Sequence, residues 1–337
     1  MNVPLSSLEI SHFPVMLNEI IKVCSPEKGG NFIDCTFGGG GYSEALLNFP
    51  KTNVIALDRD IHVKKKAEFL KKKFLDRFSF YNEKFSNLDQ VANNKKIDAI
   101  IFDLGVSSFQ LLDMERGFSF KSKAKIDMSM GLTNVSAEHI LNNYDQESLK
   151  SIIRVFGDEK EASKITKNII KFRKNKKISK VSELVEIITK SKKKNYSKKI
   201  NVCTKTFQAI RIFVNKEITE LVEGIDKATQ VIKPGGKIII VSFHSIEDKI
   251  AKFYFNNYSK NRSKPSRYLP EEKLISNIYF ENYRNDILQP SQKEIQINNA
   301  SRSAKLRFAI RNNNQFTSSK DLRVKFKKYL DLENVEN

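Results

Sequence analysis

A chain of 337 residues with 40% hydrophobic and 29% charged residues and a formal net charge of +20 is long enough for one large globular domain or two ordinary ones. No apolar run reaches the about 18 residues that cross a bilayer, and the N-terminal residues have neither the basic start nor the apolar core of a secretory signal. The three cysteines are too few and too scattered for a disulfide framework or a zinc site, so we expect a soluble cytoplasmic protein without a metal.

Short apolar runs rich in β-branched and aromatic residues alternate with helical patterns in the first third of the chain. The runs predict strands at 31–38, 53–58, 78–82 and 97–105, and the patterns between them predict helices at 42–49, 61–75 and 86–93. Strands that alternate with helices form βαβ units and a parallel, doubly wound sheet. Two later runs, 237–245 after a "KPGG" turn and 304–311, predict further strands.

The stretch between the fourth and fifth predicted strands, 106–236, is too long for a single crossover connection. A helix over 207–232 can supply the crossover, and further helical patterns lie at 136–156, 159–175 and 181–193. We therefore predict an α/β fold with an inserted helical domain. Its parts are a discontinuous sheet domain, 1–107 and 206–311, a basic helical insert, 108–205, and a polar, partly disordered C-terminal tail, 312–337.

Basic residues are concentrated in the predicted insert. Lysines outnumber arginines 46 to 13 in the whole chain, which a compositional bias of the genome produces without any functional demand. Residues 160–199, however, hold 15 Lys or Arg against three acidic residues, a net charge of +12. Such a run is either a solvated helix surface or a surface for a polyanion, and its concentration favours the polyanion. We expect Lys192, Lys193 and Lys194 to meet phosphates.

A run of four glycines, 38–41, follows the first predicted strand, which ends at Asp34. The run is not the dinucleotide fingerprint G-x-G-x-x-G, because a serine or a glutamate stands where the third glycine belongs. A carboxylate beside the loop would also repel a pyrophosphate. S-adenosylmethionine has no phosphate and carries a sulfonium and an ammonium group. Asp34, Asp58 and Asp103, at three strand ends, therefore suit it by charge, whereas each taken singly suits a cap or a turn.

Six segments of the chain form a distinctive ordered set. They are "HFPVMLNEII" (12–21), "DCTFGGGGYS" (34–43), "IDAIIFDLGVSSFQLLDMERGFSF" (97–120), "IDMSM" (126–130), "TKTFQAIRIFVNKE" (204–217) and "KPGGKIIIVSFHSIED" (233–248). This set resembles the bacterial 16S rRNA (cytosine-N4)-methyltransferase family, and the resemblance runs from residue 12 to about residue 311. It implies a class I methyltransferase fold with an inserted helical domain, S-adenosylmethionine as cofactor, and methylation of a cytidine near the ribosomal P site of 16S rRNA in the small subunit.

The resemblance also implies which residues contact the methyl donor. Carried over position by position, they are Gly40, Gly41, Tyr42, Asp58, Phe85, Asp103 and Gln110. Tyr42 replaces the histidine of many relatives, so a backbone contact is expected there rather than a side-chain contact. Phe109 replaces a proline, which loosens the turn that presents Gln110. Phe85 is a candidate to flank the adenine ring, and an ordinary core position is its alternative.

The exocyclic amine of cytosine is a poor nucleophile because its lone pair is delocalised into the ring. An enzyme helps by placing acceptors against the N–H groups and aligning nitrogen, methyl carbon and sulfur for in-line displacement. Asp103 ends the fourth predicted strand and is the candidate catalytic acceptor, with donor binding as its alternative role. Asp127 and His244 are second candidates, and a structural role is the alternative for His244.

Two other classes of function stay open from the sequence. A methyltransferase for a small molecule or a protein shares the donor site but needs no basic insert, and a methyltransferase for another RNA is a further alternative. A non-catalytic RNA-binding assembly factor shares the insert but not the three aspartates.

Overall fold

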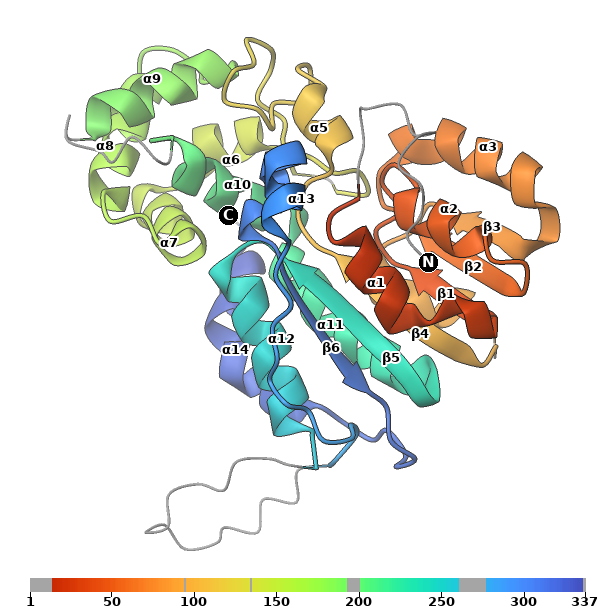
Figure 1. Cartoon of the computed structure of the whole chain (residues 1–337). Coiled ribbons are helices and arrows are strands. Elements are labelled where there is room, and N and C mark those ends of the chain that lie inside the picture. The colour runs from red at the N-terminus through yellow and green to blue at the C-terminus, as the bar shows by residue number, and fades with distance from the viewer. Residues whose placement is uncertain (1–13, 94, 134, 193–200, 261–276, 336–337) are drawn as a thin grey trace, which may run out of the picture. The chain divides into compact units, whose positions relative to one another are not determined.

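The computed structural model describes residues 14–93, 95–133, 135–192, 201–260 and 277–335 (Figure 1). The chain divides into two compact units. Unit 1 comprises Met1–Gly105 and Glu220–Lys325, and unit 2 comprises Val106–Thr219 and Phe326–Asn337. Unit 2 therefore differs from the predicted insert, 108–205, because it also includes the residues up to Thr219 and the end of the chain.

A six-stranded sheet forms the centre of unit 1 (Figure 1). In spatial order its strands are β3 (Phe78–Tyr81), β2 (Thr52–Leu57), β1 (Gly30–Asp34), β4 (Ile97–Asp103), β5 (Ile232–Ser242) and β6 (Lys305–Ile310). Neighbouring strands are parallel except β5 and β6, which are antiparallel. The strand order reverses between β1 and β4, so the prediction of a doubly wound α/β sheet is confirmed.

The turn predicted at "KPGG" is a bulge near the start of β5. Ile97 pairs with Ile232 and Ala99 pairs with Lys237, so a single residue of β4 faces four residues of β5. Gly235 in this bulge has a φ of +79°, a backbone conformation that favours glycine. The regular part of β5 therefore begins at Lys237, where the sequence predicted the strand.

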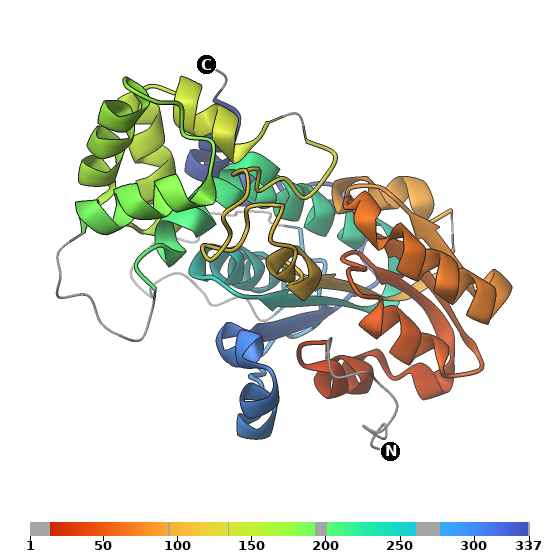
Figure 2. The same cartoon turned by 90° about the horizontal axis from the view of Figure 1, so that it is seen from above.

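Helices lie on both faces of this sheet (Figure 2). They are α1 (Leu17–Cys24), α2 (Gly41–Leu47), α3 (Lys64–Phe74), α4 (Leu88–Val91), α11 (Glu217–Val231) and α12 (Ser245–Asn257). Two further helices, α13 (Gln292–Ile297) and α14 (Lys320–Glu333), precede and follow β6 in the chain. Phe32, Val54 and Ile101 of the strands share one buried apolar cluster with α1, α2 and α3. On the opposite face, Gly224 of α11 lies against Phe102. Successive side chains of a strand point to opposite faces, so β4 serves both layers.

Unit 2 is helical in its described part. Its helices are α5 (Ser108–Leu112), α6 (Ala137–Asn143), α7 (Gln146–Gly157), α8 (Ala162–Arg173), α9 (Val181–Ser191) and α10 (Thr204–Asn215). Helix α7 packs against α10, where the ring centroids of Phe156 and Phe213 are 6.5 Å apart. Helix α8 contacts both α7 and α9 and buries Ile165 and Ile169, which lie on one face because they are four residues apart.

Two predicted helices are each divided in the structure. The helix predicted over 136–156 is interrupted before α7, where the Asp145 side chain caps α7 by accepting a hydrogen bond from the Ser148 N–H. The helix predicted over 207–232 is interrupted at Lys216, which has a φ of 48° and ends α10. One or two non-helical residues barely disturb the apolar periodicity on either side, so the pattern alone predicted one continuous helix.

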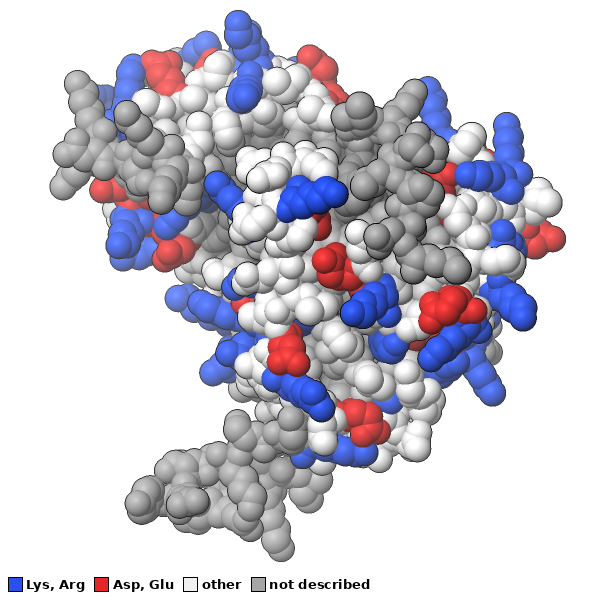
Figure 3. All heavy atoms as spheres, in the orientation of Figure 1, with Lys and Arg blue, Asp and Glu red and all other residues white. Residues whose placement is uncertain are grey.

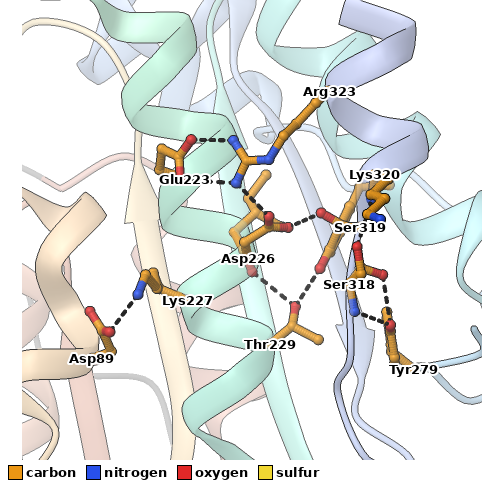
Figure 4. Close-up of polar contacts among 12 residues, drawn as sticks. Asp89, Glu223, Asp226, Lys227, Thr229, Tyr279, Ser318, Ser319, Lys320 and Arg323 are labelled. Atoms are coloured by element: carbon orange, nitrogen blue, oxygen red, sulfur yellow. Dashed lines mark hydrogen bonds and ion pairs between the residues drawn. The ribbon is translucent and has the colours of Figure 1, made fainter.

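The end of the chain differs from the predicted polar tail. Helix α14 covers Lys320–Glu333, and side chains at its start bind α11 within unit 1 (Figure 4). Arg323 forms ion pairs with Glu223 and Asp226, and the Asp226 carboxylate also accepts a hydrogen bond from the Ser319 hydroxyl. A polar composition therefore does not mean disorder here, because the polar groups have partners on α11.

We expect Leu322→Ala, in the first turn of α14, to lower the free energy of unfolding by about 2–5 kcal/mol, because the Leu322 side chain is fully buried. The matched control is Val324→Ala on the same helix. Val324 is 73% exposed, so its loss should change the free energy of unfolding by about 0.5 kcal/mol or less. Urea unfolding measures both variants. Equally small effects would show that α14 contributes nothing to the fold and that the tail prediction was right.

Candidate active site

The carboxyl ends of β1, β2 and β4 bring three aspartates to the point where the strand order reverses. Asp34 ends β1, Asp103 ends β4 and Asp58 follows β2 directly. The Asp34 carboxylate lies near enough to the other two to raise the pKa of each. Ligands bind at this edge in doubly wound sheets, so it is the place in unit 1 where a cofactor site is expected.

Asp34 supports the glycine loop from inside the protein. Its carboxylate is fully buried and accepts hydrogen bonds from the Ser43 hydroxyl at 2.7 Å and from the Thr36 N–H at 3.3 Å. Burial raises the pKa of Asp34 to about 6, and the two hydrogen bonds oppose this rise. Since Asp34 has no exposed surface, it holds the start of α2 in place and does not offer its charge to a ligand.

Asp58 is fixed by two backbone N–H groups. Gly38 donates to one carboxylate oxygen at 2.7 Å and Asp60 donates to the other at 2.8 Å. Burial raises the pKa of Asp58 to about 6 although both hydrogen bonds lower it, and the residue as a whole is half-buried. Each carboxylate oxygen has a further lone pair, so Asp58 can accept two hydroxyl groups from a ligand without moving.

Asp103 shares a hydroxyl proton with a main-chain carbonyl. The Tyr42 hydroxyl oxygen is 3.1 Å from Oδ2 of Asp103 and 2.5 Å from the Val15 carbonyl oxygen. One hydroxyl carries one proton, so it donates to one of these two oxygens at a time. Burial raises the pKa of Asp103 to about 8, the Tyr42 hydrogen bond lowers it, and neighbouring carboxylates raise it again. With its pKa raised to about 8, Asp103 is ionised in part of the molecules at neutral pH, and that part grows as the pH rises.

The second oxygen of the Asp103 carboxyl group, Oδ1, is buried and has no hydrogen-bond partner among the described residues. A buried polar atom without a partner costs roughly 1–3 kcal/mol and is uncommon in native proteins. The Asp103 backbone is itself held, because its N–H donates to the Thr36 hydroxyl oxygen at 2.8 Å. A rigid acceptor with an unused oxygen suits an incoming N–H group, such as the ammonium of S-adenosylmethionine or an amine substrate.

The glycine loop is shaped by its own packing. Gly40 has a φ of +74°, and a Cβ at this position would lie 2.8 Å from the Phe37 ring. A Cβ at Gly41 would lie 2.1 Å from a Pro14 side-chain carbon. Both positions therefore require glycine for the turn itself, and a larger residue would disturb the loop whether or not a ligand binds there.

Phe85 has both a core contact and an exposed part. It is the first residue of a short 3-10 turn, Phe85–Asn87, and its ring centroid lies 5.4 Å from that of Phe102 at an interplanar angle of 82°. Gly224 of α11 gives it space, since a Cβ there would lie 2.6 Å from the ring. The remaining exposed part of Phe85 is the surface that an adenine ring would use.

Residues 9–312 match the model of the MraW methylase family. The chain belongs to the MraW methylase family. It is therefore a methyltransferase, and the class I fold predicted for it is the fold of unit 1. A methyltransferase family of the class I type implies S-adenosylmethionine as the methyl donor.

Curated relatives of this methylase match along nearly their whole length. The ribosomal RNA small subunit methyltransferase H of Rickettsia canadensis is 40% identical over 304 residues, which cover 90% of this chain and 98% of that protein. The protein with the same description from Ehrlichia canis is 41% identical over 304 residues, which cover 89% of this chain and 99% of that protein. Among solved structures, an rRNA methylase from Streptococcus thermophilus matches with a TM-score of 0.38 at 12% identity, covering 87% of this chain and 96% of that chain.

Two of the predicted site residues of this methylase, Gln110 and Asp127, belong to unit 2. Gln110 is buried in a capping box at the start of α5: its side-chain oxygen accepts from the Ser107 N–H at 3.0 Å and its N–H donates to the Ser107 hydroxyl oxygen at 3.2 Å. This box holds the turn at Gln110, and the loosening expected from Phe109 in place of a proline stays a prediction. Burial raises the pKa of Asp127, and Arg116 nearby lowers it.

His244, the other second candidate of the methylase, serves as the N-cap of α12. Its Nδ1 faces the Glu247 N–H at 3.5 Å, and its Nε2 lies 3.1 Å from a Glu247 carboxylate oxygen. Glu247 in turn accepts from the His244 N–H at 3.2 Å. Both ring nitrogens thus face groups of the same helix turn, which favours the structural role that the sequence left open.

Sequence patterns did not predict the residues that form hydrogen bonds to the aspartates of the methylase site. Thr36 and Ser43 position Asp103 and Asp34, and the Tyr42 hydroxyl contacts Asp103. The backbone contact from Tyr42 to the methyl donor stays a prediction. A serine two residues after the glycine run was the available signal for Ser43, and it served only to reject the dinucleotide fingerprint. Tyr42 gave no signal, because its contact joins residues 61 positions apart.

Proposed function

We propose that this chain transfers a methyl group from S-adenosylmethionine to N4 of a cytidine in 16S rRNA of the small ribosomal subunit, near the P site. The observation that carries the proposal is the buried, unpartnered Oδ1 of Asp103 at the reversal point of the sheet. Relatives about 40% identical over about 90% of the chain are described as ribosomal RNA small subunit methyltransferases, which supports the class of substrate. The reaction takes place in the cytoplasm, where the subunit is made.

S-adenosylmethionine supplies a methyl group made electrophilic by the positive sulfur that carries it. Asp58 accepts both ribose hydroxyls, since its carboxylate is already oriented by two backbone donors. The exposed part of Phe85 flanks the adenine, and the backbone of Gly40 and Gly41 borders the amino-acid part. Gln110 is retained as a donor contact from the resemblance, with its amide oxygen engaged in the cap of α5.

Asp103 is proposed to accept a hydrogen bond from the target amine. When it is ionised, Oδ1 can accept an N–H of the cytosine amine and thereby raise the electron density on nitrogen and fix its direction of approach. The amine loses its proton after the methyl group has been transferred, and water can take that proton. Contact with the ammonium group of the donor is the alternative use of the same oxygen.

The cysteines disfavour methylation of the cytosine ring at C5, which requires a thiolate nucleophile. Burial raises the pKa of Cys24 to about 12 and that of Cys203 to about 11. Burial and the neighbouring Asp34 raise the pKa of Cys35 far above the usual thiol value. All three thiols therefore stay protonated at neutral pH, which disfavours the C5 reaction.

We expect the product to be N4-methylcytidine. Tritiated S-adenosylmethionine should label the rRNA of small subunits and not their proteins, and nucleosides of the digest should co-elute with an N4-methylcytidine standard. Chromatographic standards are needed because C5-methylcytidine has the same mass. Cys35→Ala should keep the product and most of the activity. Co-elution with C5-methylcytidine, together with loss of product in Cys35→Ala, would refute the N4 assignment.

A further inference from the structure

Helix α8 of unit 2 presents four lysines on one face. Lys164, Lys167, Lys171 and Lys174, here called the α8 lysine stripe, follow one another at intervals of three, four and three residues. At about 100° per residue they fall within an arc of about 80°, and all four are exposed. The buried residues of the helix, such as Ile165 and Ile169, lie on the opposite side.

The stripe lysines have no ion pair among the described residues, whereas several other lysines of unit 2 do. Ion pairs join Lys150 to Glu147, Lys176 to Glu183, Lys177 to Glu138, Lys190 to Glu186, Lys192 to Glu159 and Lys205 to Asp158. Helix α8 contains no acidic residue, and its one arginine, Arg173, points inward and donates to the Tyr144 carbonyl at 2.6 Å. The stripe is therefore a row of charges that the described part of the chain does not neutralise.

Lys192, which the sequence predicted to meet phosphates, is excluded from that role. Its side chain is only 2% exposed, and its Nζ lies 2.5 Å from Oε2 of Glu159. Lys193 and Lys194 lie outside the described residues. On the face drawn in Figure 3, Lys and Arg are interspersed with Asp and Glu, so the net charge of +20 alone does not identify a binding surface. The stripe differs because its four exposed lysines lie on one face of one helix and have no ion pair among the described residues.

We propose that the α8 lysine stripe binds the phosphate backbone of the rRNA substrate; this rests on the proposed function and names the surface of unit 2 that holds the RNA. With a rise of 1.5 Å per residue, successive lysines are spaced by about 4.5 or 6 Å along the helix, so their ammonium groups form a regular row. Lysine is a point charge on a flexible stem, which adapts to phosphates but does not select bases. The stripe therefore supplies affinity, while sequence is selected elsewhere.

The test compares two variants of the full chain with equal net charge. One changes the stripe, Lys164→Gln, Lys167→Gln, Lys171→Gln and Lys174→Gln; the control changes four ion-paired lysines of unit 2, Lys150→Gln, Lys177→Gln, Lys190→Gln and Lys205→Gln. Binding of small subunits is measured between about 50 and 200 mM salt. Each lost phosphate contact lowers the slope of log affinity against log salt by about 0.7, so the stripe variant should lose about 3 in slope and about 100-fold in affinity.

The control variant should keep a slope of log affinity against log salt within about 1 of the wild-type slope. Its four lysines already form ion pairs with carboxylates, so they contribute less to phosphate binding. S-adenosylmethionine binding should be unchanged in both variants, which shows that the fold is intact.

Equal salt slopes in the two variants would overturn the proposal that the stripe binds RNA, since net charge alone would then account for the effect. Loss of binding to whole subunits with normal binding to protein-free 16S rRNA would overturn it too, because the stripe would then contact a ribosomal protein. Wild-type chain that transfers no methyl group to subunits refutes the proposed function separately.

Discussion

Asp103→Asn is expected to slow methyl transfer to small subunits by about 100- to 1,000-fold, the range seen when one preorganised polar group at a reacting centre is removed. The substitution keeps the shape of the side chain but removes the negative charge that the target amine needs as an acceptor. Oδ1 of Asp103 is one of the buried side-chain atoms that have no hydrogen-bond partner among the described residues, so it is available to the amine. Single-turnover transfer of tritium from S-adenosylmethionine measures the effect.

The pH dependence separates this role from a structural one. Burial raises the pKa of Asp103 to about 8, so kcat/KM of the wild type should rise about tenfold per pH unit below pH 8 and level off above it. Asp103→Asn should lack this rise. The control is Asp76→Asn, an exposed aspartate of unit 1, which should leave both rate and profile unchanged. An Asp103→Asn enzyme with wild-type rate and profile would contradict the assignment.

Stability should move in the opposite direction to activity. The folded-state pKa of Asp103 lies above the ordinary value of 3.8, so its contribution to stability is complete below about pH 4 and is lost as the pH rises through about 8. Asparagine does not ionise, so the Asp103→Asn variant should not lose this stability as the pH rises. The melting temperature of the variant relative to wild type should therefore increase between pH 6 and pH 9, which differential scanning calorimetry without ligand measures.

Asp58→Ala is expected to weaken S-adenosylmethionine binding by about 1.5–3 kcal/mol, roughly 10- to 150-fold, because hydrogen bonds from the ribose to a charged acceptor are lost. Calorimetric titration measures the dissociation constant. Donor binding by wild type should also weaken below about pH 6, the pKa to which burial raises Asp58, because a protonated carboxyl group accepts less well.

The Asp58→Ala change also leaves the Gly38 and Asp60 N–H groups without their acceptor, so part of any loss could come from the loop. A cycle with S-adenosylhomocysteine and its 2′,3′-dideoxy analogue separates the two effects. Wild type should bind the dideoxy analogue more weakly, whereas Asp58→Ala should bind both ligands alike. If removal of the ribose hydroxyls costs the same in both proteins, Asp58 does not hold the ribose.

The alternation of apolar runs with helical patterns was enough to predict the sheet. The bounds of each strand were predicted within a few residues. Buried parallel strands are continuous apolar runs, and glycine, proline and charged residues mark where these runs end. The same local pattern placed Asp34, Asp58 and Asp103 at strand ends. Helix breaks were missed at Asp145 and Lys216, and α14 was missed because its polar side chains find partners only in the fold.

The sequence by itself determined which residues reach the reversal point of the sheet, since a period of two or of 3.6 residues is a local property. The tertiary structure decided what those residues do there. Asp34 became a buried support and Asp103 an acceptor with one unused oxygen, because desolvation and hydrogen-bond partners come from residues far away in the chain, such as Tyr42 for Asp103. It likewise decided that Lys192 is buried in an ion pair while the α8 lysine stripe is exposed. A lysine has the same charge in every sequence, and only its surroundings in the fold determine whether that charge is available to a ligand.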